Sequence, residues 1–402
     1  MDPSNPTQPS VYSHLPEELL GEILSKVPAT VEKMNRMFDI QDEPIAAAIQ
    51  KLRDNGLIRN LSTDDYSNSL IAVDGGVVLE KMSGTDILLA VAVGVEGLSE
   101  DKDGGWKNGK NQFHQWQTVV PHDEANARLA QGVMFLMELT VLANASHEIR
   151  IMDGTHFTPI IKINSLLSAK EDKAGDEYVR GLENFLWETY EKVIPDIPNI
   201  VKAALADDSI IAIAKYTSSR DVLDSSIVSE QINLDDKTFF TLGLAGGEYT
   251  VPLPVGQSVE ERRKIWDDLR INCNLYIQDV DVEALNKLLA EAILPLKTKY
   301  ERAGKTSSLC FTYFKPYEDG PAYRIEIKKS LARDTARLEK VLLSIKKQIV
   351  FPEIREPFPQ YLVDLMAKSV SSGLFAIQEA IRLSPELKID AGKFNLLFNY
   401  RT

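Results

Sequence analysis

Two apolar stretches of the sequence each end in an aspartate that is followed directly by glycine. Asp74 closes the run Ile71–Val73, and Asp153 closes Ile149–Met152. A buried carboxylate is costly unless it is paired, hydrogen-bonded or bound to a metal ion. Glycine has no side chain, so the backbone or a ligand can come close to each acid. Both aspartates are therefore candidates for chemistry.

Two more acids lie within helical apolar patterns. Glu138 has Phe135 and Leu142 among its neighbours one helical turn away, so it does not belong to a polar face. Asp364 lies between two pairs of apolar residues in the stretch 362–366. Neither position suits an ordinary solvated carboxylate.

The chemistry that such a set supports is metal-dependent. Four carboxylates with no matching buried Lys or Arg repel one another unless cations lie between them. Oxygen ligands without thiols suit Mg²⁺ or Mn²⁺. Two such ions, about 3.5–4 Å apart, can hold both the attacking water and the leaving oxygen of a phosphodiester. The set Asp74, Glu138, Asp153 and Asp364 therefore predicts a nuclease-type site.

Other interpretations compete with this one. A single Asp-Gly pair at a strand end is more often a turn than a ligand, and the two pairs leave that alternative open. The sequence has five histidines, none in a nucleophile-elbow context, which disfavours a Ser/His/Asp hydrolase. It contains neither GxxxxGK[ST] nor GxGxxG, which disfavours nucleoside triphosphate or dinucleotide binding.

Composition narrows the class of protein. The chain has 402 residues, is 44% hydrophobic and has a net charge of −14, which argues against broad non-specific adhesion to nucleic acid. Cys273 and Cys310 form no metal-ligand or disulfide pattern, so reduced thiols and a cytoplasmic location are expected. We find no signal peptide and no apolar run of membrane-spanning length.

The elements that must position the acids alternate between strands and helices. The hairpin 71–95, the strand 114–120, the helix 123–145 and the strand 149–154 come first, and a buried strand at 210–215 follows. Strands at 309–315 and 323–327 and helices at 334–349 and 360–368 complete the pattern, with 393–400 as a last strand or packed tail. This order predicts an α/β fold, in which chemistry collects at strand ends.

The N-terminal part has a different character. Residues 1–13 are rich in Pro and Ser and predict a disordered leader. Residues 14–61 predict three helices and a short strand, which resembles a winged helix. DNA contact, docking of a partner and capping of the main domain are all open for this segment. Lys51 and Arg53 are the only basic residues of its third helix, so a strong phosphate-binding face is disfavoured.

The order of these motifs resembles the NurA nuclease family over residues 65–402. The resemblance rests on Ile71–Gly76, Met137–Leu139 and Ile151–Gly154, followed by Ile213–Lys215 with Ser218–Arg220, Tyr313–Pro316 with Arg324–Glu326, and Glu356–Ala367. It implies an RNase H-like mixed sheet flanked by helices. It also implies Mn²⁺-dependent cleavage of DNA, as a 5′→3′ exonuclease and single-strand endonuclease. The implied assembly is a homodimer that acts with a HerA-type hexameric ATPase in DNA end processing or phage defence.

The resemblance also assigns residues. Asp74, Glu138 and Asp153 match the metal carboxylates of that family, and Asp364 falls where it has a His or Asp ligand. Lys215 is expected beside the scissile phosphate.

Two positions depart from the family pattern. Gly76 stands where the family often has Ser, and Glu356 where it often has Tyr. These departures favour the alternative function of a non-catalytic RNase H-like scaffold for an ATPase. A winged-helix transcription factor with an α/β sensor domain is a third, weaker alternative.

Overall fold

The structure is a computed structural model of the 402-residue chain. It describes residues 15–37, 42–67, 69–98, 105–107, 109, 112–124, 126–156, 158–159, 161–162, 165, 207–225, 228, 232–255, 309–351, 353–390 and 392–394. The predicted leader over residues 1–13 lies outside these ranges, and so does most of the predicted C-terminal strand or tail at 393–400.

Strands and helices alternate through the chain, as the sequence pattern predicts. The described elements are α1 (Glu17–Ser25), α2 (Val27–Met37), α3 (Asp42–Asp54), β1 (Ile58–Asn60), β2 (Leu70–Lys81), β3 (Thr85–Glu96), β4 (Phe113–Pro121), α4 (Asn126–Asn144), β5 (Ile149–Asp153), β6 (Ile210–Ala214), α9 (Asp236–Gly243), β7 (Glu248–Thr250), β8 (Leu253–Pro254), β9 (Leu309–Phe314), β10 (Tyr323–Lys328), α12 (Lys329–Arg333), α13 (Thr335–Lys347), α14 (Phe358–Lys368) and α15 (Val370–Leu383).

The strands form one mixed sheet in the order β1-β7-β9-β10-β6-β5-β2-β3-β4, with β8 paired to β9. β2, β3 and β4 form an antiparallel meander, and β5 and β6 then add in parallel beside β2. β10 and β9 continue the sheet in antiparallel pairing. The predicted α/β class, with a mixed sheet flanked by helices, is confirmed.

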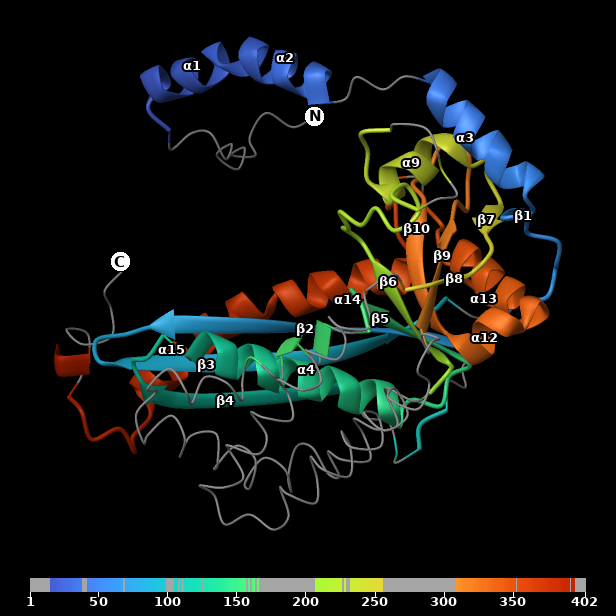
Figure 1. Ribbon diagram of the computed structural model, residues 1–402. Helices are drawn as coiled ribbons and strands as arrows, with labels where there is room; N and C mark the ends of the chain where they lie inside the picture. Colours follow the sequence, from blue (N-terminus) through green and yellow to red (C-terminus); the bar gives the residue numbers. More distant parts are fainter. Residues whose placement is uncertain are drawn as a thin grey trace, which may run out of the picture.

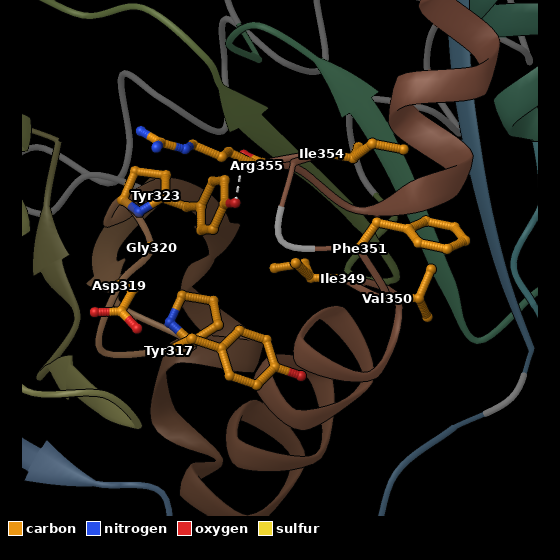
Figure 2. A pocket seen from close by; sticks show the side chains of 11 residues that line it. Tyr317, Asp319, Gly320, Tyr323, Ile349, Val350, Phe351, Ile354 and Arg355 are labelled. Atoms are coloured by element: carbon orange, nitrogen blue, oxygen red, sulfur yellow. Dashed lines mark hydrogen bonds between the residues drawn. The ribbon is translucent and has the colours of Figure 1, made fainter.

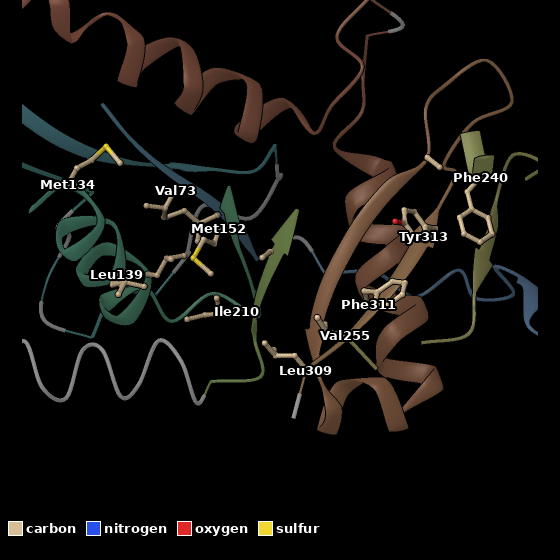
Figure 3. Close-up of a cluster of buried hydrophobic side chains, with 14 of the residues drawn as sticks. Val73, Met134, Leu139, Met152, Ile210, Phe240, Val255, Leu309, Phe311 and Tyr313 are labelled. Carbon is tan, nitrogen blue, oxygen red and sulfur yellow. The ribbon is translucent and has the colours of Figure 1, made fainter. Parts of the chain in front are cut away.

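Helices cover both faces of the sheet around β2. Figure 1 shows α4 along one face of β2 and β3, with α14 on the opposite face. Alternate residues of β2 point to the two layers: Ile71 and Val73 join the core that includes α4, whereas Leu70 and Ala72 join the core that includes Val363 of α14. Figure 3 shows part of the first core, with Val73, Met152 and Leu139 close together.

β1 forms the edge of the sheet opposite to β4, and α3 packs beside it. β1 pairs with β7, and α3 buries four apolar side chains, Ile45, Ala48, Ile49 and Leu52, against the region of α9. Arg53 donates two hydrogen bonds to the carboxylate of Glu248 on β7. The winged-helix detail is not confirmed, and the division of the chain between residues 61 and 65 stays a prediction.

α1 and α2 differ from α3 because neither packs into the core. They lie end to end away from the sheet in Figure 1, and every side chain of these helices that the structure describes is exposed or half-buried. The apolar side chains that they expose include Leu19, Ile23, Leu24, Val31 and Met34.

Two of the described helices, the five-residue α12 and the longer α15, are not predicted from the sequence. α15 follows α14 after a single residue and contributes one buried residue, Leu374. Of the helices that the structure describes, none has both the length and the apolar composition needed to cross a membrane.

Candidate active site

Three chemically distinctive side chains come from three neighbouring parallel strands: Asp74 lies within β2, Asp153 ends β5 and Lys215 directly follows β6. Val73 pairs with Met152, so the next step in register places Asp74 beside Asp153. Asp153 in turn pairs with Ile213 of β6, and Lys215 follows two residues later on the same face. Strand register brings these three side chains together on the face that α14 covers.

Glu138 reaches this group from α4, on the opposite face of the sheet. Its side chain is 2% exposed. A Cβ atom on Gly75 would lie 2.5 Å from Glu138 Oε1 and 2.4 Å from Met134 Cγ. The absence of a side chain at Gly75 therefore allows the glutamate to lie directly against β2, next to Asp74.

α14 covers the site on the face of the sheet opposite to α4. Gln360, in its first turn, donates a 2.7 Å hydrogen bond from Nε2 to Asp153 Oδ1. Asp364 lies one turn later and accepts a 2.6 Å hydrogen bond from Lys368 Nζ. Asp364 and Asp153 each have an oxygen 3.8 Å from Lys215 Nζ, so the two acids belong to one side-chain group.

Gly76 determines how closely α14 approaches. A Cβ atom there would lie 2.2 Å from the carbonyl oxygen of Ala367 and 3.1 Å from Val370 Cγ1. A side chain at this position would push the helix away from β2, because the obstacle is backbone. Gly76 is therefore explained by helix packing, whatever the residue does in the family that the sequence resembles.

Lys215 lies at the centre of the acids. Its Nζ atom is 3.1 Å from Glu356 Oε2 and 3.8 Å from both Asp153 Oδ1 and Asp364 Oδ1. Burial lowers the pKa of Lys215, but the three carboxylates offset this, and its pKa lies above the ordinary value. The acids therefore do have a matching cation, contrary to the expectation from sequence, because Lys215 balances part of their charge.

The remaining acids are crowded and poorly solvated. Burial, aided by the negative charge of Asp153, raises the pKa of Asp74 to about 7. Burial also raises the pKa of Glu138 well above its ordinary value, and Asp74 and Asp153 add to the effect. This part of the site therefore carries uncompensated negative charge when its acids ionise.

The types of side chain in the site, though not their present arrangement, suit a hard divalent cation. Glu138 Oε1 is buried and has no hydrogen-bond partner within the described residues, which is uncommon for a buried oxygen. Asp74, Asp153 and Asp364 supply further carboxylate oxygens, the ligands that Mg²⁺ and Mn²⁺ prefer. Among the described residues, however, no three His, Cys, Asp or Glu side chains stand in a ready-made metal-binding arrangement. Metal binding would require these side chains to adjust.

His156 and Glu326 have structural roles. His156 is buried, its backbone N–H donates to Glu326 Oε2, and its Nε2 lies 3.2 Å from the carbonyl oxygen of Ile210. Glu326 also lies 3.5 Å from Arg324. Together these residues fasten the turn after Asp153 to β10. Glu326 is therefore a paired structural acid.

Sequence reasoning missed three residues of the site. Gln360 and Lys368 lie in an ordinary amphipathic pattern, and Glu356 was noted only as a departure from a family pattern. The i−4 and i+4 spacing around Asp364 is the one signal that could have identified Gln360 and Lys368, because residues four apart share a helix face.

No family model matches the chain, and no curated protein matches it. Among solved structures, the NurA nuclease from Sulfolobus solfataricus is similar over 92% of this chain and 100% of its own, with 11% identity and a TM-score of 0.48. NurA with manganese is similar over 90% and 100%, with 14% identity and a TM-score of 0.40. NurA bound to dAMP and manganese is similar over 94% and 99%, with 14% identity and a TM-score of 0.39. At these values the likeness carries no chemistry, so the function of the site must follow from its own side chains.

Proposed function

We propose that this protein is a divalent-metal-dependent nuclease that hydrolyses phosphodiester bonds in DNA. The observation that supports this most is the convergence of Asp74, Asp153 and Asp364 around Lys215, with Glu138 next to Asp74 from the other face of the sheet. The five residues come from different elements, and a shared site is the simplest reason for bringing like charges together.

Asp74, Glu138 and Asp153 would hold the metal, with Asp364 as a further ligand. Bound Mn²⁺ or Mg²⁺, as one or two ions, would lower the pKa of the attacking water and neutralise the leaving oxygen. Gln360 keeps Asp153 in place through its 2.7 Å hydrogen bond. Lys215 remains protonated because its pKa is raised, so it can donate to a phosphate oxygen as negative charge develops there.

The finer activity is proposed from the sequence resemblance. It comprises 5′→3′ exonuclease and single-strand endonuclease cleavage by a homodimer, together with a HerA-type ATPase, in end processing or phage defence. The net charge of −14 fits a protein that receives DNA from a partner, because such a surface repels a polyanion. A cytoplasmic location fits the two cysteines, of which Cys310 is a buried free thiol.

A non-catalytic scaffold is the second candidate. The contact between Lys215 and Glu356 supports it, since a carboxylate 3.1 Å from the ammonium group competes with phosphate for that cation. Gly76 no longer supports it, because helix packing explains the glycine.

The test compares cleavage and metal binding in one set of proteins. We expect the full-length protein to cut labelled single-stranded DNA with Mn²⁺, and Asp74→Asn and Asp153→Asn to lower the rate by on the order of 100-fold or more. Glu379→Gln, which alters a surface acid of α15, is the control. If the wild-type protein neither cleaves DNA nor binds Mn²⁺ in calorimetry, the scaffold is the correct interpretation. If Asp74→Asn cuts as fast as the wild type, the site assignment is wrong.

A further inference from the structure

A cavity lies beside the candidate active site and is not used by the chemistry proposed above. Its volume is about 370 Å³, within the range of small-molecule sites. The turn between β9 and β10 forms one wall, and the segment between α13 and α14 forms the other. Figure 2 shows Tyr317, Tyr323 and Ile349 around the opening.

The cavity is next to Lys215 through the sheet. Arg324 of β10 pairs with Ala214 of β6, so the next step in register sets Tyr323 opposite Lys215. Residues opposite each other on antiparallel strands share a face and lie about 5 Å apart. Tyr323 lines the cavity, and Lys215 lies among the acids, so one strand spacing separates the cavity from the proposed phosphate position.

The second wall, the segment between α13 and α14, also connects the cavity with Lys215. The hydroxyl of Tyr323 donates a 2.6 Å hydrogen bond to the carbonyl oxygen of Arg355. The next residue, Glu356, pairs with Lys215. A ligand that places a phosphate at Lys215 therefore has its adjoining group within reach of the cavity.

The lining selects a flat, uncharged group. Eight of the eleven lining residues are apolar or aromatic, namely two tyrosines, two prolines, Ile349, Val350, Phe351 and Ile354, and the two charged ones are Asp319 and Arg355, which have opposite signs. Tyr317 is 42% exposed, although its hydroxyl donates to the carbonyl oxygen of Lys346. The Lys346 ammonium group lies 5.0 Å from the centre of the Tyr317 ring, where it can attract a neighbouring phosphate. Stacking on an exposed aromatic ring beside a cation is a common way to hold a base of single-stranded DNA.

We propose that this cavity binds an unpaired nucleobase next to the phosphate that Lys215 contacts. The inference rests on the proposed nuclease function and refines its substrate. A base that enters the cavity cannot remain paired or stacked in a duplex, so the site acts on single strands or on opened duplex ends. The selection is by shape and π-face, and it is therefore independent of base sequence.

The experiment measures binding separately from cleavage. Fluorescence anisotropy with a short labelled oligothymidylate in EDTA is recorded for the full-length wild type and for Tyr317→Ala. A set of oligonucleotides, each with one abasic position, is measured in parallel. We expect Tyr317→Ala to weaken binding about 10-fold. In this set, one particular abasic position should weaken binding to the wild type by a similar factor. The same abasic position should not weaken binding to Tyr317→Ala any further.

Two control variants make the result specific. Tyr317→Phe retains the ring and should bind like the wild type. Tyr66→Ala removes another exposed tyrosine, 41% exposed and with Lys347 5.3 Å from its ring centre, and should also bind like the wild type.

Three results would overturn the inference: no oligonucleotide binding, equal binding by Tyr317→Ala, or equal weakening by Tyr66→Ala. Cleavage together with base-independent binding would refute the cavity as a nucleobase site but would leave the proposed nuclease function intact. Base-dependent binding without cleavage or Mn²⁺ binding would refute the nuclease and leave a single-strand binding site.

Discussion

Gln360 is the residue whose role the sequence least suggested. It is 1% exposed, its amide donates to Asp153, and its Oε1 atom is buried without a hydrogen-bond partner among the described residues. A group that hydrogen-bonds to a metal ligand orients that ligand and strengthens metal binding. Gln360 is thus a positioning residue for the proposed site.

Gln360→Leu should raise the Mn²⁺ concentration needed for half-maximal cleavage by about 10-fold, because Asp153 loses its amide partner. The measurement is the initial rate of cleavage against Mn²⁺ concentration, with thermal unfolding to confirm the fold. Gln378→Leu on α15 makes the same change outside the site and should have no effect. An unchanged Mn²⁺ dependence in Gln360→Leu would show that the hydrogen bond is only structural.

Gly76 permits a test of packing at a single atom. Gly76→Ser should lower the free energy of unfolding by about 1–3 kcal/mol, because the new side chain meets the Ala367 carbonyl oxygen. Urea denaturation measures the loss. Gly373→Ala is the matched control, since its nearest new contact is Leu89 Cδ2 at 3.9 Å. A stable Gly76→Ser variant would mean that α14 can move away from β2 at little cost.

At the scale of elements, the sequence predicts individual strands and helices better than it predicts which of them pair or pack together. Asp74, Glu138 and Asp153 were recognisable because apolar residues surround them in the chain. The pairing of β2 with β5, which brings the two aspartates together, depends on strand register, and alternation alone does not specify a partner. The docking of α14 likewise depends on a close contact at Gly76 that no local pattern reveals.

α15 was missed for a related reason. Its apolar residues follow α14 after only Ser369, so the two helices read as one segment with a frayed end. Phe375 and Leu383 are largely exposed, and the helix therefore gains little from the core that would mark it as a separate element. Helices stabilised by tertiary packing give the clearest sequence signals, and this one has little packing.

α9 is fastened to the loop before it by a buried acid. Asp236 accepts hydrogen bonds from the backbone N–H groups of Val222 and Leu223. Burial raises the pKa of Asp236 to about 6 from 3.8. The folded protein therefore binds this proton more tightly than the unfolded chain does. The resulting stabilisation is complete below the unfolded pKa and is lost as the pH rises through about 6.

When the pH rises from roughly 5 to 7.5, the free energy of unfolding of the wild type should consequently fall by about 1 kcal/mol relative to that of Asp236→Asn. Urea denaturation of both proteins at the two pH values gives the comparison, and the difference between them removes the contribution of other titrating groups. A difference that stays constant with pH would contradict the raised pKa.

At the scale of the whole molecule, the N-terminal helices fall into two groups. α1 buries no residue, and the described side chains of α2 are all exposed. α3 instead buries Ile45, Ala48, Ile49 and Leu52, and Gly243 of α9 is so close that a Cβ atom there would lie 2.3 Å from Ile49 Cγ1. The structure thus favours capping of the sheet for α3 and leaves α1 and α2 without a core role.

Two truncations test this division. Removing residues 1–41 should leave the free energy of unfolding and the DNA-cleavage rate unchanged, because the site is built from β2, α4, β5, the end of β6 and α14. Removing residues 1–61 should destabilise the protein severely. Each fully buried Ile or Leu side chain contributes roughly 1.5–3 kcal/mol, and α3 buries three of them, Ile45, Ile49 and Leu52, in a fold of marginal stability.

The longer truncation also removes the partner of Glu248. Burial raises the pKa of this carboxyl, but the hydrogen bonds from Arg53 and from the backbone N–H of Ala245, together with the charges of Arg53 and Lys315, hold it below its ordinary value. Glu248→Gln together with Arg53→Ala should therefore cost less than the sum of the two single changes, because each single change already breaks the pair.

If the shorter truncation unfolds the protein or abolishes cleavage, α1 and α2 are part of the catalytic body. If it abolishes only the response to an ATPase partner, they are a docking arm.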